Sequence, residues 1–151
     1  YWLFFELIWR DFFKYVSMQH KDKFFSKDGI YGVDKIWSHD KDKLSKWING
    51  KTSEPFVNAN MIELSKTGFM SNRGRQNVAN YLTKELKIDW RIGAEYFESL
   101  LIDYDVHSNY GNWLYNAGIG NDSMPFRKFN PKLQSERYDP DKSYEKIWLN
   151  D

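Results

Sequence analysis

The sequence predicts an all-α fold, a multi-helix bundle built from one domain. Its apolar segments have helical length and are separated by residues that commonly begin or end helices. No segment shows the sustained two-residue alternation of apolar and polar side chains that is typical of a half-buried strand. Neither a glycine-rich dinucleotide loop nor an internal repeat occurs. We therefore expect one helical unit over residues 1–151, long enough to enclose a hydrophobic core.

An N-terminal helix is the first element expected. Residues 1–10 are apolar nearly all round, a pattern typical of a helix that is buried on several sides. The segment lacks the basic region and the small-residue cleavage site of a signal peptide. We interpret it as the middle of a larger fold whose upstream part is absent. A polar connection over residues 19–39 follows, which is too long for a simple turn.

Boundary residues divide the rest of the chain into further helices. Glycine often follows a helix, proline suits the first helical position, and Ser or Asp accepts hydrogen bonds from the free N–H groups of the first turn. Signals of these kinds stand at Gly50, Pro55, Gly68, Ser71 and Asp89. The expected helices comprise residues 41–49, 55–68, 71–86, 89–102 and 106–117, and two short helices that Pro131 and Asp141 open.

The composition narrows the possible classes of protein. Aromatic residues make up 19% of the chain, with seven Trp, ten Tyr and eleven Phe, and so many rings require a tight core or a planar ligand. The absence of Cys excludes disulfides and thiolate metal sites. His20, His39 and His107 are scattered without metal-ligand spacing, so we expect no metal. No apolar run reaches the length of a membrane span. We expect a soluble, intracellular protein that does not contact membranes.

Charge is unevenly distributed although the net charge is only +1. Residues 66–91 contain six basic residues, whereas residues 95–105 contain four acidic residues and no basic one. A local basic face of this kind could bind phosphate groups. A solvated helix face is an equally good interpretation of the charges alone.

Three stretches contain residue types that carry chemistry. In residues 71–77, polar groups crowd the start of a helix, where free N–H groups favour anions. Residues 103–113 combine two carboxylates with an amide and several rings. Glu6 is a lone carboxylate in an apolar helix, which is costly unless the group is partnered or used. From the residues alone, Trp37, Trp47, Trp90 and Trp113 could be plain core residues, and Arg75 with Asp103 a buried ion pair.

Together with four further motifs, these stretches resemble the photolyase/cryptochrome family in order and spacing, over nearly the whole chain. The further motifs are Gly50-Lys51-Thr52, Asp89-Trp90-Arg91, Phe129-Asn130-Pro131 and Ile147-Trp148-Leu149. Finer features resemble the DASH branch, namely Trp2-Leu3 ahead of Phe5-Glu6-Leu7, Gln76 after Asn-Arg-Gly-Arg, and Tyr115 two residues past Trp113. The resemblance implies the helical FAD-binding domain of that family, truncated at its N-terminal side.

The resemblance implies a set of cofactor contacts. Proteins of this family fold FAD into a U shape within a helical bundle. Residues that match the family's cofactor-binding positions are Asn72, Arg75, Asp103, Asp105 and Asn109. Arg75 would pair with Asp103, and Asn109 would face flavin N5. Because an amide does not readily deliver a proton, Asn109 is expected to favour an anionic reduced flavin.

Electron transfer and DNA binding are implied in the same way. Trp113, Trp90 and Trp37 match the tryptophans that relay an electron to photoexcited flavin, and with Glu6 and Asn109 they complete the expected catalytic set. Positions that match the pocket for a flipped pyrimidine dimer are Glu6, Trp9, Arg10, Asn72, Arg73, Gln76, Tyr115 and Gln134. The DASH branch is associated with repair of such dimers in single-stranded DNA, where an unpaired lesion is cheaper to extrude.

The chain also departs from the family pattern. The antenna-binding domain, where a pigment such as a folate is expected, does not occur in the sequence, nor does the Ser/Thr-rich segment that holds the FAD diphosphate. Weak FAD binding, or none, by this segment alone is therefore expected. Ser53 follows Gly50-Lys51-Thr52 where the family usually has glycine, and a commonly acidic position is Asn58.

Two function classes remain open. One is a light-driven lyase that splits cyclobutane pyrimidine dimers, and the other is a non-catalytic blue-light receptor or DNA-binding regulator with the same flavin. Retention of Glu6, Trp9 and Asn72 favours repair. A (6-4) photolyase is disfavoured, because its pair of histidines falls on Asn72 and Gln76.

Overall fold

The computed structural model describes residues 1–150, which form eight α-helices and no β-strand. The helices are α1 (Trp2–His20), α2 (Lys41–Ile48), α3 (Pro55–Thr67), α4 (Asn72–Asn80), α5 (Trp90–Leu100), α6 (Val106–Ala117), α7 (Pro131–Tyr138) and α8 (Ser143–Leu149). A 3₁₀ turn, η1 (Lys21–Phe25), follows α1, and a π-helical turn, η2 (Tyr81–Glu85), follows α4. The prediction of an all-α fold is confirmed.

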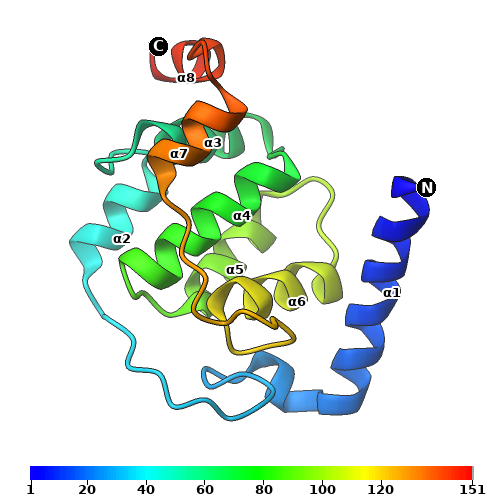
Figure 1. The fold of residues 1–151 in the computed structure, drawn as a ribbon. Coiled ribbons are helices and arrows are strands. Elements are labelled where there is room, and N and C mark those ends of the chain that lie inside the picture. Colours follow the sequence, from blue (N-terminus) through cyan, green and yellow to red (C-terminus); the bar gives the residue numbers. More distant parts are fainter. Residues whose placement is uncertain (151) are drawn as a thin grey trace.

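Helices α4, α5 and α6 lie at the centre of the molecule, and the other helices pack around them (Figure 1). Helix α6 packs against α5 and α4, α3 packs against α4, and α7 and α8 pack on α3 (Figure 1). Helix α1 runs along one side of the molecule and packs against α6. The core between these helices contains large side chains with no exposed surface, among them Trp47, Trp90 and Leu82. None of the helices within residues 1–150 combines the length and the hydropathy needed to cross a membrane.

The predicted boundary residues act as expected. The Ser71 hydroxyl accepts a hydrogen bond from the backbone N–H of Gly74 (3.0 Å), and an Asp89 carboxylate oxygen accepts one from Arg91 (3.0 Å). Pro55 occupies the first turn of α3, and Gly68 ends that helix in the left-handed conformation at φ 69°. These contacts satisfy backbone groups that a helix end leaves free.

The helix predicted over residues 71–86 is not a continuous α-helix. After Asn80 the backbone widens, so that the N–H of Leu86 donates to the Tyr81 carbonyl five residues earlier (3.1 Å). The Thr83 hydroxyl donates to the carbonyl of Ala79 (2.8 Å) and competes there with the regular backbone bonds. A π-helical turn inserts one extra residue into the helix, and apolar periodicity does not reveal it.

The prediction that the N-terminal segment is buried on several sides is wrong for the described residues. Trp2, Leu3 and Phe4 are 71–72% exposed. Only the later turns of α1 are packed, where Phe13 and Val16 are buried against the rest of the chain. Helix α1 therefore presents a long aromatic surface beyond its contact with α6.

Gly111 sets how closely α1 approaches α6. A Cβ at this position would lie 2.9 Å from Phe13 Cβ and would clash with the Phe13 ring. Alanine normally favours a helix over glycine by about 1 kcal/mol, but overpacking here should outweigh that gain. We expect Gly111→Ala to lower the free energy of unfolding by about 1–3 kcal/mol in urea denaturation. In a Phe13→Ala background the same change should cost clearly less, and an equal cost in both backgrounds would contradict the assignment.

Candidate functional site

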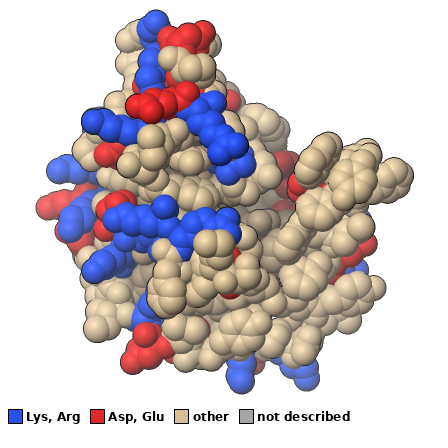
Figure 2. Space-filling view, in the orientation of Figure 1, with Lys and Arg blue, Asp and Glu red and all other residues tan. Residues whose placement is uncertain are grey.

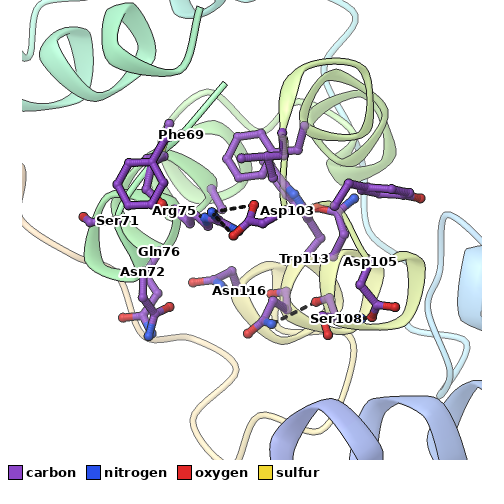
Figure 3. Close-up of a pocket in the computed structure, with 17 residues that line it drawn as sticks. Phe69, Ser71, Asn72, Arg75, Gln76, Asp103, Asp105, Ser108, Trp113 and Asn116 are labelled. Carbon is purple, nitrogen blue, oxygen red and sulfur yellow. Dashed lines mark hydrogen bonds and ion pairs between the residues drawn. The ribbon is translucent and has the colours of Figure 1, made fainter. Parts of the chain in front are cut away.

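A cavity of about 290 Å³ opens between the α3–α4 connection, the α5–α6 connection and one face of α6 (Figure 3). Its size is at the lower end of the range of small-molecule pockets, about 300–1,000 Å³. Its apolar lining comprises Phe69, Met70, Phe97, Leu101 and Trp113. Its polar lining includes Asn72, Arg75, Gln76, Asp103, Asp105, Asn109, Asn112 and Asn116. A lining that combines aromatic and aliphatic side chains with hydrogen-bonding groups suits a planar heteroaromatic ligand that has polar groups along an edge.

Backbone contacts bring the two connections of the cavity together. The N–H of Ile102, after α5, donates to the carbonyl of Gly68, after α3 (3.0 Å). Helix α4 starts close to α3, because Gly74 leaves no room for a side chain: a Cβ there would lie 2.8 Å from Met70 Cγ and would clash with the Asn60 amide. The start of α4 and the start of α6 therefore face the same space.

Arg75 and Asp103 connect the two sides of the cavity rim (Figure 3). Arg75 Nη2 donates to both carboxylate oxygens of Asp103 at 2.9 Å, and Arg75 Nε donates to the carbonyl of Met70 at 2.8 Å. The side chains are 28% and 53% exposed, so the alternative of a buried ion pair is wrong. An ion pair this exposed contributes about 0–1 kcal/mol to stability. Its main effect is to fix the direction of the guanidinium at the cavity.

Asp105 lines the cavity and caps the start of α6. Its carboxylate accepts a hydrogen bond from the backbone N–H of Ser108 (2.8 Å). Partial burial acts to raise the pKa of Asp105, but the N–H and hydroxyl donors of Ser108 outweigh it and hold the pKa below its usual value. The charges of His107 and Arg10 act in the same direction as Ser108.

Asn109 is buried between α6 and α5. Its Nδ2 donates to the carbonyl of Ala94 (3.0 Å), which leaves Oδ1 without a hydrogen-bond partner among residues 1–150. Because a carbonyl can only accept, the amide must direct its nitrogen to Ala94. The group that Asn109 offers to a ligand in the cavity is therefore an acceptor.

Two cavity residues, Asn112 and Asn116, were not identified from the sequence. Their Nδ2 groups donate to the carbonyls of Ser108 (2.8 Å) and Asn112 (2.9 Å), four residues earlier in each case. The spacing of Asn109, Asn112 and Asn116 by three and four residues places them on one helical face. That spacing is visible in the sequence and predicts a row of polar side chains along one face of α6.

The three tryptophans expected to relay electrons lie in one continuous core. Trp113 lines the cavity and packs on Gly93 of α5, where a Cβ would lie 2.6 Å from Trp113 Cζ3 and closer still to Cη2. Trp90 lies three residues before Gly93, on the same face of α5. The indole N–H groups of Trp90 and Trp37 both donate to the carbonyl of Lys27 at 3.3 Å.

Trp47 lies on another side of Trp113, with ring centroids 6.3 Å apart. It is fully buried, and its N–H donates to the carbonyl of Val78 (3.1 Å). These contacts are consistent with a structural role for Trp47.

The residues expected to contact DNA are only partly brought together. Asn72 and Gln76 line the cavity. Glu6, Trp9, Arg10, Arg73, Tyr115 and Gln134 lie outside its lining. The expectation that Glu6 is a buried carboxylate is wrong, because its side chain is exposed on α1 and forms no hydrogen bond or ion pair within residues 1–150. Arg10 pairs with Asp11 (3.2 Å) rather than with Glu6.

Arg73 lies on the outer surface of α4. Its guanidinium carbon is 4.7 Å from the ring centroid of Tyr138, and its Nη1 donates to Gln76 (2.8 Å). Gln134 accepts a hydrogen bond from Asn77 (3.3 Å), which connects α7 to α4. Figure 2 shows Lys and Arg side chains in two groups, one around α7 and one in front of α4. The N-terminal turns of α1 are mostly uncharged in the same view.

Comparison with known proteins gives consistent matches. Residues 2–151 match a family described as the FAD binding domain of DNA photolyase. Cryptochrome DASH from Gloeobacter violaceus is 56% identical over 149 residues, which is 99% of this chain and 30% of that protein. The chain spans about 30% of the length of the curated relatives it matches.

Solved structures give the same result. A cryptochrome from Synechocystis superposes with a TM-score of 0.96 at 55% identity, over 99% of this chain and 31% of its own. An archaeal photolyase from Sulfolobus tokodaii, whose structure contains two FAD molecules, has a TM-score of 0.90 at 38% identity, over 95% of this chain and 33% of its own.

Proposed function

Because the chain belongs to the photolyase/cryptochrome family, with an FAD-binding domain as its fold, we propose that it serves light-driven repair of DNA. The substrates proposed are cyclobutane pyrimidine dimers, chiefly in single strands. The observation that carries the proposal is the position of Trp113, which lines the cavity and continues into a core that contains Trp90 and Trp37.

FAD is the cofactor of this domain, and the cavity residues fit its isoalloxazine ring. Phe69 and Trp113 offer apolar surface, while Arg75, Asp103 and Asn109 offer donors and acceptors. Asn109 presents an acceptor, which would hold an N–H group at N5, as the anionic reduced flavin carries. When bound and reduced, FAD supplies the electron that splits the dimer.

The protein's own residues have three tasks in this proposal. Arg75, held between Asp103 and the Met70 carbonyl, orients the cofactor edge. The buried side chains of Met70, Phe97, Leu101 and Trp113 would keep water from the part of the cofactor that contacts them, which strengthens the polar contacts there. Trp113 donates an electron when oxidised flavin absorbs light, and Trp90 and then Trp37 replace that electron.

DNA contacts are proposed on the face that contains α1, α4 and α7. Asn72 and Gln76 would contact a flipped base from the cavity rim, while Arg73 would bind a phosphate. Trp9 offers a stacking surface on α1, next to Glu6 and Arg10. Tyr115 and Gln134 complete the proposed contact set, and unpaired lesions would enter more easily than paired ones.

The test is illuminated repair with the FAD-loaded, chemically reduced full-length protein. Dimer-containing single strands should be restored to monomers in the light and not in the dark. Matched undamaged strands should bind more weakly. Flavin that photoreduces normally, without any repair or preference for damage, would replace this proposal with the blue-light receptor alternative.

Arg73→Ala should weaken binding of damaged and undamaged DNA alike. The Arg73 guanidinium forms no ion pair with a carboxylate within residues 1–150, so it is available to a phosphate. Its loss should reduce the slope of log affinity against log salt by about 1. Lys46→Ala, at an exposed position on α2, is the matched control and should leave the slope unchanged. A loss of affinity for damaged DNA only would show that Arg73 recognises the lesion instead.

A further inference from the structure

Tyr110 links the tryptophan core to a surface carboxylate. Its ring centroid lies 5.9 Å from that of Trp90 in an edge-to-face arrangement, and its hydroxyl donates to Glu98 Oε2 at 3.2 Å. Tyr110 is on α6 and is half-buried, whereas Glu98 is exposed on α5. One end of this side chain therefore touches the proposed electron relay, and the other end touches a base in contact with water.

Trp37, whose indole N–H donates to the same Lys27 carbonyl as that of Trp90, is a poor place to leave a positive charge. The Nζ of Lys35 lies 5.4 Å from the centroid of the Trp37 ring, and a cation there repels the charge of an oxidised indole. The Trp37 N–H donates to the Lys27 carbonyl, which is no base. The Trp37 N–H therefore does not donate to a carboxylate that could take up its proton when the indole is oxidised.

The Tyr110 hydroxyl, unlike the Trp37 N–H, donates to a carboxylate. Oxidation of a phenol releases a strongly acidic proton, and an aligned carboxylate within hydrogen-bond distance can accept it. Burial, and then the nearby Glu98 and Glu95, raise the pKa of Tyr110 to about 12. The phenol therefore keeps its proton at neutral pH until it is oxidised, so that electron and proton leave together.

We propose that Tyr110, with Glu98 as its proton acceptor, is the terminal electron donor of a second branch of the relay. Photoexcited oxidised flavin would supply the oxidising power: Trp113 would give up one electron, which Trp90 would replace. The oxidised Trp90 indole then takes one electron from Tyr110, while the Tyr110 hydroxyl proton moves to the Glu98 carboxylate. The products are neutral Trp90, a neutral tyrosyl radical and a protonated Glu98, so charge and atoms balance.

The charge-separated state should live longer with the radical on Tyr110 than with the radical on Trp37. Return of the electron to Tyr110 requires return of the proton from Glu98, which can pass it to water because that side chain is exposed. The proposal rests on the electron relay of the proposed function and adds a residue to it.

Flash transient absorption of the full-length protein carrying oxidised FAD tests the proposal. The wild type should show tryptophan radicals that convert to a tyrosyl radical, and the conversion should slow in heavy water. Tyr110→Phe should remove the tyrosyl signal and shorten the lifetime of the charge-separated state. Glu98→Gln keeps a polar partner but no base, and should slow the conversion by about 100-fold or more.

Tyr144→Phe is the matched control, because Tyr144 also donates to a glutamate, Glu63 (2.6 Å), but contacts no tryptophan ring among residues 1–150. It should leave the tyrosyl signal intact. A tyrosyl signal unchanged in Tyr110→Phe, or lost equally in Tyr144→Phe, would overturn the assignment of Tyr110. The tryptophan relay of the proposed function would not be affected by that result. Absence of any tryptophan radical in the wild type would overturn the relay of the proposed function and this branch with it.

Discussion

Trp113→Phe should abolish photoreduction of the oxidised flavin while FAD stays bound. Trp113 is the member of the tryptophan core that lines the cavity, and it is 2% exposed. Phenylalanine retains a ring against Phe97, whose centroid lies 5.1 Å away, but it is far harder to oxidise than an indole. The smaller side chain should lower the free energy of unfolding by about 1–3 kcal/mol, which leaves the fold intact.

Three measurements on the Trp113→Phe variant separate its effects. Flavin absorbance per protein should match the wild type, photoreduction under blue light with an external reductant should be absent, and dimer repair by chemically reduced enzyme should persist. Trp47→Phe is the control, since Trp47 is equally buried and touches Trp113. It should cost similar stability and leave photoreduction in place. Undiminished photoreduction in Trp113→Phe would mean that another residue is the first donor.

Local signals were sufficient to predict the helices. Ser71 and Asp89 each cap the helix that begins at the next residue and accept a hydrogen bond from two or three residues ahead, so the sequence near each boundary determines it. Pro55 and Gly68 act through their own backbone preferences, which no distant contact has to supply. The π-helical turn after Asn80 escaped prediction, because the apolar spacing around it also fits a regular α-helix.

Burial and partners could not be predicted from local patterns. An apolar helix face predicts burial, yet the first turns of α1 are exposed because only its later turns reach α6. The motifs predicted that Arg75 pairs with Asp103. The exposure of the pair, however, depends on how the α3–α4 connection meets the α5–α6 connection. The contact of Tyr110 with Trp90 and Glu98 joins residues that are 12 to 20 positions apart on two different helices, and no spacing rule predicts it.

Asp103→Ala should remove most of the FAD from the purified full-length protein with little effect on folding. Asp103 holds the Arg75 guanidinium through two contacts of 2.9 Å, and it is 53% exposed. Water can solvate Arg75 in the variant, so the free energy of unfolding without FAD should fall by only about 0–1 kcal/mol. FAD binding should suffer far more, because the guanidinium would no longer be fixed at the cavity edge before the cofactor arrives.

Asp103→Asn separates charge from shape at this position. The amide keeps an acceptor for Arg75 but loses the ionic contribution, so its FAD content should lie between those of the wild type and Asp103→Ala. Unfolding curves recorded without FAD should nearly coincide for all three proteins, whereas flavin absorbance per protein should differ. If Asp103→Ala kept a full complement of FAD, the Arg75–Asp103 pair would be a surface ion pair without a role in cofactor binding. If it unfolded instead, the pair would be structural despite its exposure.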